Sequence, residues 1–416
     1  MWDSLWRNAT LATMAGDGAS GLVEAGALAA EAGRIAWLGP EAALPGAPAT
    51  LAHEVHDLGG CLVTPGLVDP HTHLVFLGSS LTDFEVLAAG GGRADLEPAG
   101  AGIIGLALRT REASEEALFE DSAGRIKALI QNGVTTVESK SGSGLDFDSE
   151  LRLLRVSRAL GRAFPVDVVS TFLGAHGLPP EYAGRRDDYV DFLVARLLPA
   201  AIAADLVDQV DGFCDRAGFT HAQMSKQFDL AVAHGLPVKL HADQYTDFGA
   251  GALVAKYDGV SADHLEYASE ATIGAMAEAG TVATLIPGAH WSLHETTRPP
   301  VTRFREAGVA MALATNCNPV SSPATSPSVI MHMACHLFGL TAAEALAGFT
   351  VNGAKALGLE ADRGSLEVGK LADLAVWEAR HPAELSYWIS GTAPVTVIKR
   401  GRVVHVRAPN GPIPRA

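Results

Sequence analysis

Three stretches of the chain carry side chains that could bind one metal ion together. His71-Thr72-His73 follows a short apolar run, and His241 and Asn316 each follow another such run. Residues two apart in a strand face the same side, so His71 and His73 can reach a single ion. Three imidazoles favour a borderline ion such as zinc, with iron as the alternative. Such an ion would lower the pKa of a bound water toward about 7 and polarise the bond under attack.

Two further histidines end apolar runs in the same way. His264 ends the run SADH, and His176 ends TFLGAH. Either could be a histidine packed in a core. Because both fall where the first three do, we expect His264 to transfer protons and His176 to contact a substrate.

The elements that must position these residues form a regular alternation. Eight short β-branched or aliphatic runs alternate with helical patterns such as those over 115–132 and 149–162. This alternation predicts parallel βαβ units, and eight of them predict a (β/α)8 barrel with its active site at the carboxyl ends of the strands. The eight runs span 66–73, 133–141, 166–176, 206–215, 236–243, 259–266, 280–288 and 308–316.

The two ends of the chain have a different pattern, with short strands and turns. We expect a barrel over 64–362 and a small β-sandwich built from 1–63 and 363–416, because chain termini often lie close together.

Composition narrows the class of protein. A net charge of −16 argues against nucleic acid as a partner. Four scattered cysteines fit a reducing cytoplasm, and no apolar run reaches the roughly 18 residues of a membrane helix. The start of the chain lacks the pattern of a signal peptide. We therefore expect a cytoplasmic protein with a small-molecule substrate, and a homodimer on general grounds.

Several of these motifs resemble a known superfamily. PGLVDPHTH, the later HAD and SADHL look like the amidohydrolase superfamily. Within it, GVTTVESKSG, STFLGAHGLPPEY, ATNCNPVSSP and TVNGAKALGL are similar to the imidazolonepropionases of histidine degradation. The resemblance implies a mononuclear metal barrel with a β-sandwich, which hydrolyses a C–N bond in a five-membered ring bearing a propionate arm. It implies a metal at His71, His73 and His241, and a pocket that includes His176 and His264.

The chain also departs from that family pattern. The metal-binding Asp is Asn316 and a following Gly is Val320, while the water-positioning Glu is Gln244. A substrate-binding Arg is Ser80, and two tyrosines become Ser143 and Arg93. We take His264, Gln244 and Asn316 as the catalytic set, with Asn316 also as a metal ligand. The expected substrate-binding residues are His176, Arg93, Ser80, Ser143, Asn318 and Ser321.

These departures leave three hypotheses for function. The first is a metal-dependent hydrolase of an imidazolone ring that bears propionate. The second is a related enzyme that opens hydantoin-5-propionate or releases sulfide from 2-thiohydantoin-5-propionate, because sulfide leaves with less acid catalysis than an amine. The third is an inactive protein that binds a metal or a ligand. A nucleobase deaminase is disfavoured, because Gln244 offers no acid near the third histidine.

Overall fold

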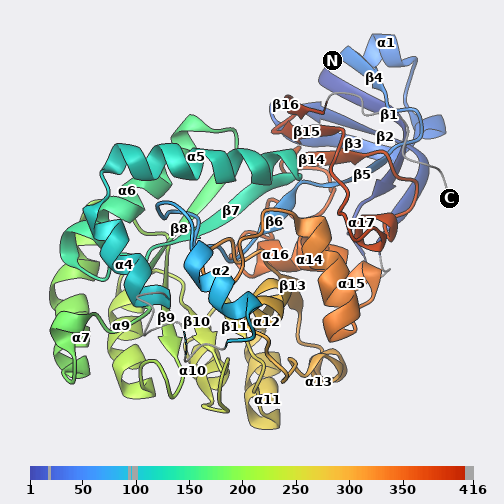
Figure 1. The fold of residues 1–416 in the computed structure, drawn as a ribbon. Helices are drawn as coiled ribbons and strands as arrows, with labels where there is room; N and C mark the ends of the chain where they lie inside the picture. Colours follow the sequence, from blue (N-terminus) through green and yellow to red (C-terminus); the bar gives the residue numbers. More distant parts are fainter. Residues whose placement is uncertain (17–19, 92–94, 96–101, 408–416) are drawn as a thin grey trace.

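The computed structural model of the chain describes residues 1–16, 20–91, 95 and 102–407. Two sheets organise these residues, one in a barrel and one built from both ends of the chain (Figure 1). No helix in the described ranges has the length and apolarity that crossing a membrane requires.

The first sheet contains eight parallel strands, and each pairs with the next along the chain. This confirms the predicted (β/α)8 barrel, since all eight apolar runs supply one strand each. The strands are β6 (Leu67–Asp69), β7 (Val134–Lys140), β8 (Asp167–Ala175), β9 (Gln209–Cys214), β10 (Lys239–Ala242), β11 (Ser261–His264), β12 (Val282–Leu285) and β13 (Met311–Leu313).

The barrel is closed between its first and last strands by contacts just beyond their ends. The Asn316 N–H donates to the His71 carbonyl at 2.9 Å. The Asp69 carboxylate accepts from the Thr315 N–H at 3.1 Å and from the Thr315 hydroxyl at 2.5 Å. Burial raises the pKa of Asp69 to about 7, although these hydrogen bonds oppose the shift. The seam therefore joins the two segments that carry His71 and Asn316.

Helices surround the strands, and their first turns explain where several begin. Ser114 and Asp146 accept backbone N–H groups at the starts of α5 and α6, and Thr220 with Gln223 forms a capping box at α9. The helices are α2 (Leu81–Ala88), α4 (Gly102–Glu112), α5 (Glu115–Gln131), α6 (Phe147–Ala163), α7 (Arg186–Phe192), α8 (Leu198–Ala203), α9 (His221–Ala233), α10 (Ala250–Lys256), α11 (Glu270–Ala279), α12 (Pro287–Ser292), α13 (Val301–Ala307), α14 (Pro327–Met333), α15 (Ala342–Gly348) and α16 (Val351–Lys355).

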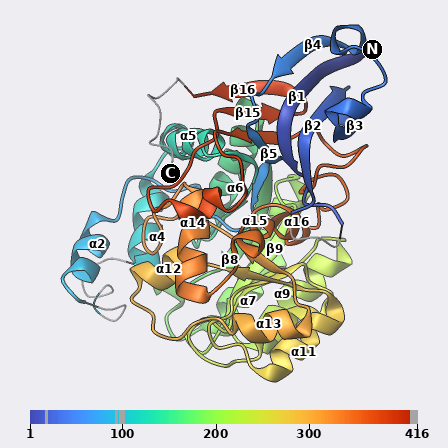
Figure 2. The ribbon, with the colours of Figure 1, turned by 90° about the vertical axis from the view of Figure 1, so that its right-hand side faces the viewer.

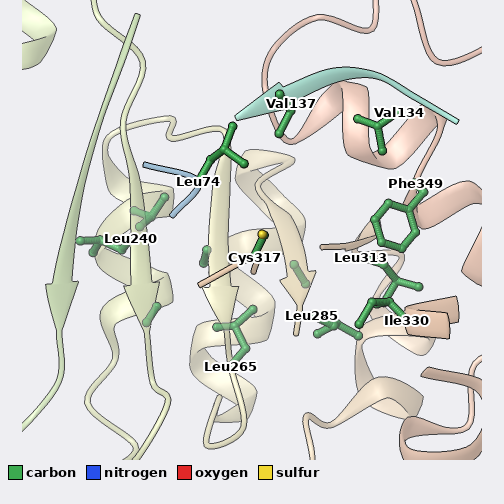
Figure 3. Close-up of a cluster of buried hydrophobic side chains, with 14 of the residues drawn as sticks. Leu74, Val134, Val137, Leu240, Leu265, Leu285, Leu313, Cys317, Ile330 and Phe349 are labelled. Atoms are coloured by element: carbon green, nitrogen blue, oxygen red, sulfur yellow. The ribbon is translucent and has the colours of Figure 1, made fainter. Parts of the chain in front are cut away.

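One large apolar core lies between the barrel and its helices. Figure 3 shows part of it: Leu285 and Leu313 from β12 and β13 lie near Ile330 and Phe349, while Leu240 of β10 and Leu265, just after β11, lie farther along the same core. All six side chains are fully buried. Burying side chains of this size stabilises the fold by about 1.5–3 kcal/mol each. The strands that lead to the site are therefore supported by a close-packed core.

The second sheet joins the two ends of the chain, as predicted, and Figures 1 and 2 show its blue and red strands side by side. Its centre is the antiparallel pairing of β14 with β5, in which Leu374 lies opposite Pro65. The strands are β1 (Trp2–Ala12), β2 (Leu22–Glu31), β3 (Arg34–Pro40), β4 (Ala52–Asp57), β5 (Leu62–Pro65), β14 (Leu374–Trp377), β15 (Thr396–Lys399) and β16 (Arg402–Val406); the short helices α1 (Pro48–Leu51) and α17 (Glu384–Tyr387) accompany them.

Trp377 ties this sheet to the barrel. Its side chain is fully buried, and its indole N–H donates to the Thr64 hydroxyl at 3.0 Å. The ring also covers Gly133, where a Cβ atom would lie 3.3 Å from the indole and φ is +94°. Glycine therefore fits this position, and the turn into β7 packs directly beneath the terminal sheet.

Candidate active site

The predicted metal ligands gather at the carboxyl ends of the barrel strands. His241 lies within β10, whereas Asn316 lies three residues beyond the end of β13. His71 and His73 also lie beyond their strand, because β6 ends at Asp69. The expectation that these two histidines share a face of a strand was wrong. An irregular segment, closed against Asn316 at the seam, directs both of them toward His241.

Backbone conformation at two of these positions is unusual for residues with side chains. His264 has φ +82° and Asn316 has φ +56°. Left-handed conformations are costly for most residues, although asparagine tolerates them better than others. Such conformations cost about 1–3 kcal/mol each and persist where the surroundings hold them.

Two of the histidines lie beside buried carboxylates, but His71 alone is hydrogen-bonded to one, because His241 Nδ1 has no hydrogen-bond partner among the described residues. His71 Nδ1 lies 2.6 Å from Asp263 Oδ2, and His241 Nδ1 lies 3.1 Å from Asp211 Oδ2. An ionised carboxylate only accepts hydrogen bonds, so the His71 proton lies on Nδ1. The lone pair of His71 is therefore on Nε2, which is buried and has no hydrogen-bond partner among the described residues. A metal-binding histidine is commonly oriented in this way.

Both carboxylates belong to a buried charged group beneath the histidines, which we call the floor. Its members are fully buried: Glu138, Lys140, Asp211, Lys239 and Asp263. Lys140 Nζ lies 2.8 Å from Glu138 and 2.7 Å from Asp211, and Lys239 Nζ lies 3.4 Å from Asp263. When all five are ionised, three carboxylates and two ammonium groups leave a net charge of −1. This charge faces the histidines and favours a cation above them.

Charged groups within the floor shift one another's pKa values. Burial alone would lower the pKa of Lys140, but Asp211, Glu138 and Asp263 raise it above its usual value. Burial would raise the pKa of Asp263, but Lys239 and Lys140 hold it below its usual value. The opposite charges packed against Lys140 and Asp263 therefore favour the ionised forms of these two groups, whereas burial raises the pKa of Glu138 above its usual value.

The donor atoms above the floor fit a divalent metal ion. His241 Nε2 and His73 Nε2 lie 3.3 Å apart. Two nitrogens bound at about 2.0–2.1 Å to one tetrahedral zinc ion would be roughly 3.4 Å apart. His71 Nε2 and Asn316 Oδ1 are both buried without a hydrogen-bond partner in the described part of the chain. Leaving such atoms unpaired is costly, and a bound cation would satisfy them.

All the central imidazoles are neutral at neutral pH. Burial first, and nearby cationic and imidazole groups second, hold the pKa values of His71, His73 and His241 well below the usual range. Burial also lowers the pKa of His264 to about 4, although Asp263 opposes the shift. Neutral imidazoles are the form that binds metals, so the site is prepared for an ion.

His264 and His176 complete a cluster of five imidazoles. The ligand atoms of His71, His241 and His264 lie within 4.8 Å of one another, as do those of His73, His176 and His241. His176 stacks on His73 with ring centroids 4.8 Å apart, and its Nδ1–H donates to the Gly142 carbonyl at 2.9 Å. Both predicted pocket histidines therefore contact the predicted metal ligands.

A cavity of about 310 Å³ opens above this cluster. That volume lies at the small end of the range for small-molecule sites. Its described lining combines His73, His176, His241, His264 and Asn316 with an apolar side that we call the wall. The wall consists of Ile103, Ile104, Leu106, Leu178, Phe213, Phe219 and Leu293.

The predicted substrate-binding residues fall into three groups. Gln244, Ser143, Asn318 and Ser321 line the cavity. Ser80 does not; it lies at the start of α2, and its hydroxyl accepts a hydrogen bond from Arg109 at 3.4 Å. Arg93 lies outside the described residues.

Asn318 has a structural part in this rim. Its Oδ1 accepts the N–H groups of Val320 and Ser321 at 2.9 and 2.8 Å, and its amide donates to the Asn316 carbonyl at 2.7 Å. Its side chain thus fixes the loop that carries Asn316.

Our reading of the sequence overlooked two features of the site. One is the floor, whose charged residues interrupt apolar strand runs at Glu138, Lys140, Asp211 and Lys239. Charges in a buried strand could have indicated it, because charged side chains are rarely buried unless paired. The other is Arg186, which lines the cavity from the start of α7. Nothing in its local sequence distinguishes it from neighbouring Arg185.

Comparisons with known proteins agree with this geometry. Residues 62–404 match the model of the Amidohydrolase family. The chain is 52 % identical to an imidazolonepropionase of Caulobacter vibrioides over 386 residues, which cover 92 % of this chain and 96 % of that protein. It is 48 % identical to an imidazolonepropionase of Cupriavidus necator over 401 residues, 96 % of this chain and 95 % of that protein.

Solved structures share the fold at low sequence identity. A 5-methylcytosine deaminase from Klebsiella pneumoniae with bound 5-fluorocytosine matches with a TM-score of 0.77 and 19 % identity, covering 98 % of this chain and 99 % of that one. An adenosine deaminase from Xanthomonas campestris with bound zinc matches with a TM-score of 0.68 and 20 % identity, covering 97 % of this chain and 92 % of that one. At these identities the likeness shows the fold alone.

Proposed function

We propose that this chain, which belongs to the amidohydrolase family and is similar to imidazolonepropionases, hydrolyses a C–N bond in the ring of 4-imidazolone-5-propionate. One observation carries the proposal: His73 Nε2 lies 3.3 Å from His241 Nε2, and His71 Nε2 and Asn316 Oδ1 are buried without a hydrogen-bond partner in the described chain, beside a cavity sized for a small ring. Relatives that are about half identical over nearly the whole chain bear the name of that activity.

We assign zinc or iron to this point, held by His71, His73 and His241, with the Asn316 amide oxygen as fourth ligand. When bound, the ion would supply Lewis acidity, which acidifies water and polarises the ring carbon. The chain's own residues supply orientation. Asp263 accepts a hydrogen bond from His71 and fixes its imidazole, and Asp211 places a negative charge 3.1 Å from His241 Nδ1. The wall excludes water from one side of the ring, and His176 contacts the ring from beside His73.

His264 is the proton carrier in this proposal. With a pKa lowered to about 4 it is neutral at rest, so it can accept a proton from the attacking water. It would then donate that proton to the ring nitrogen as the C–N bond breaks. Asp263, its neighbour in β11, favours the protonated form and so supports the transient imidazolium.

A second candidate substrate, 2-thiohydantoin-5-propionate, is favoured by the absence of acids from the cavity. No carboxylate lines it among the residues that the structure describes, and Asn316 and Gln244 stand where acids are expected. Sulfide leaves with less acid catalysis than an amine, so hydrolytic release of sulfide suits a site whose proton carrier is an imidazole.

The deciding experiment offers both rings to the zinc-loaded and the iron-loaded protein, following ring absorbance and released sulfide. We expect turnover of the imidazolone, abolished by a chelator and restored by metal. Sulfide release without imidazolone turnover would transfer the assignment to the second substrate. Metal binding without turnover of either ring would indicate an inactive protein.

The double variant Asn316→Asp, Gln244→Glu helps to decide between the imidazolone and the thiohydantoin as substrate. If the chain acts on the imidazolone, restoring the acids raises or preserves its turnover. If the chain is adapted to the sulfur substrate, the same changes lower sulfide release. A gain in sulfide release would remove the reason for proposing that substrate.

A further inference from the structure

The cavity is nearly free of fixed charge, with one exception. Of the described lining residues, Arg186 is the single one with an arginine, lysine, aspartate or glutamate side chain; the rest are glycine or have apolar, amide, hydroxyl or imidazole side chains. An isolated cation beside an apolar wall points to an anionic ligand, because a partly desolvated charge without a partner is unfavourable.

The residues around Arg186 do not neutralise it. Asp187 accepts a hydrogen bond from the Gln223 amide at 2.7 Å, and Asp188 lies 3.3 Å from Arg185. No carboxylate of the described chain lies within salt-bridge distance of Arg186. Its Nε is buried and has no hydrogen-bond partner among these residues.

The guanidinium is also held in place. Its central carbon lies 5.7 Å from the centroid of the Phe219 ring, which is buried and belongs to the wall. This cation–π contact restrains the planar group while leaving its N–H edges for hydrogen bonds. A carboxylate matches such an edge through two parallel hydrogen bonds.

We propose that Arg186 binds the carboxylate on the arm of the substrate and so selects anionic rings. The inference rests on the proposed function. It assigns to Arg186 the substrate binding that the family pattern gives to an arginine at position 80, where this chain has a serine. Arg109, which contacts Ser80, does not line the cavity. Arg93, which the sequence predicts to bind the substrate, is the competing assignment and enters the test.

The test compares two probes that differ by the carboxylate alone in the arm: hydantoin-5-propionate and 5-ethylhydantoin. Binding of each to the zinc-loaded protein is measured by calorimetry. In Arg186→Gln we expect the affinity for hydantoin-5-propionate to fall by at least about tenfold, the range for a hydrogen bond to a charged group. The affinity for 5-ethylhydantoin should stay within twofold.

Controls separate this role from a structural one. Arg185→Gln removes the adjacent exposed arginine and should leave both affinities unchanged. Arg186→Lys keeps the charge but loses the planar fork, so its affinity for the propionate should lie between those of the wild type and Arg186→Gln. Equal losses for both probes, or a loss confined to Arg93→Gln, would overturn the proposal. Failure of the wild type to turn over any ring would refute the proposed function, while the binding comparison would still decide the role of Arg186.

Discussion

The floor and the wall of the cavity differ in the kind of side chain that forms them. The floor has five buried charged groups, each with partners at 2.6–3.6 Å. The wall has large apolar side chains, and Arg186 beside it is the single Arg, Lys, Asp or Glu of the described cavity lining. The floor orients His71 through a 2.6 Å hydrogen bond from its Nδ1 to Asp263, whereas the wall borders the space that we assign to the substrate. Metal binding and substrate choice can therefore change separately, and the departures from the family pattern at Ser143 and Val320 fall on the cavity lining, above the floor.

The largest expected effect comes from removing a ligand directly above the floor. His241→Ala should abolish stoichiometric zinc binding and lower turnover by about 10³-fold, because several kcal/mol of transition-state stabilisation are lost. Metal content by mass spectrometry and turnover are measured together. His234→Ala, at an exposed histidine just after α9, is the control and should change neither. Full metal content in His241→Ala would exclude the assigned ligand set.

Low pH should lower the free energy of unfolding of the metal-free protein, because the imidazoles above the floor become protonated. The folded-state pKa of His264 is about 4, below its usual 6.5, so folding favours the neutral form. This contribution is complete above about pH 6.5 and is lost as pH falls toward 4, by about 3 kcal/mol for His264 alone. Urea unfolding of chelator-treated protein across this range measures it. His264→Gln should show a shallower decline; parallel curves for the two proteins would contradict the assignment.

Asp263→Asn tests the floor itself. The change keeps the shape of the side chain but replaces the charged acceptor that orients His71 by a neutral amide, and it takes the net charge of the fully ionised floor from −1 to zero. Zinc affinity should fall by about 10- to 100-fold, the usual cost of losing such a partner. Asp373→Asn is the matched control, because Asp373 is buried and pairs with Lys399 at 2.6 Å in the terminal sheet. It should lower stability and leave zinc affinity unchanged.

The smallest effect is expected at the wall. Leu178→Ala removes about three carbon atoms of a half-buried side chain from the cavity lining. A fully buried methylene contributes about 0.8 kcal/mol, and half-buried carbons contribute less, so KM should rise about fivefold. Metal content and kcat should not change. Leu108→Ala, on the exposed side of α4, should leave KM unchanged. A loss of metal in Leu178→Ala would show that floor and wall are coupled.

Much of the fold followed from the sequence, and part of the site did too. Eight apolar runs alternating with helical patterns predicted the barrel strands, because strand and helix periodicities are local properties of a chain. The pairing of the two ends was also predictable. Chemistry-bearing residues at the carboxyl ends of the runs had to converge once the barrel closed, which is why His176 and His264 were expected beside His71, His73 and His241.

Tertiary structure decided what those residues contact. Sequence alone determined the types and approximate positions of the imidazoles, since these depend on local pattern and on barrel topology. It could not show that Asp263 orients His71, or that Arg186 rather than Arg185 reaches the cavity. Such contacts join residues that are far apart in the chain, and they depend on register, on side-chain direction and on left-handed turns such as that at His264. Local sequence carries no record of these distances, because packing sets them only when the whole barrel has closed.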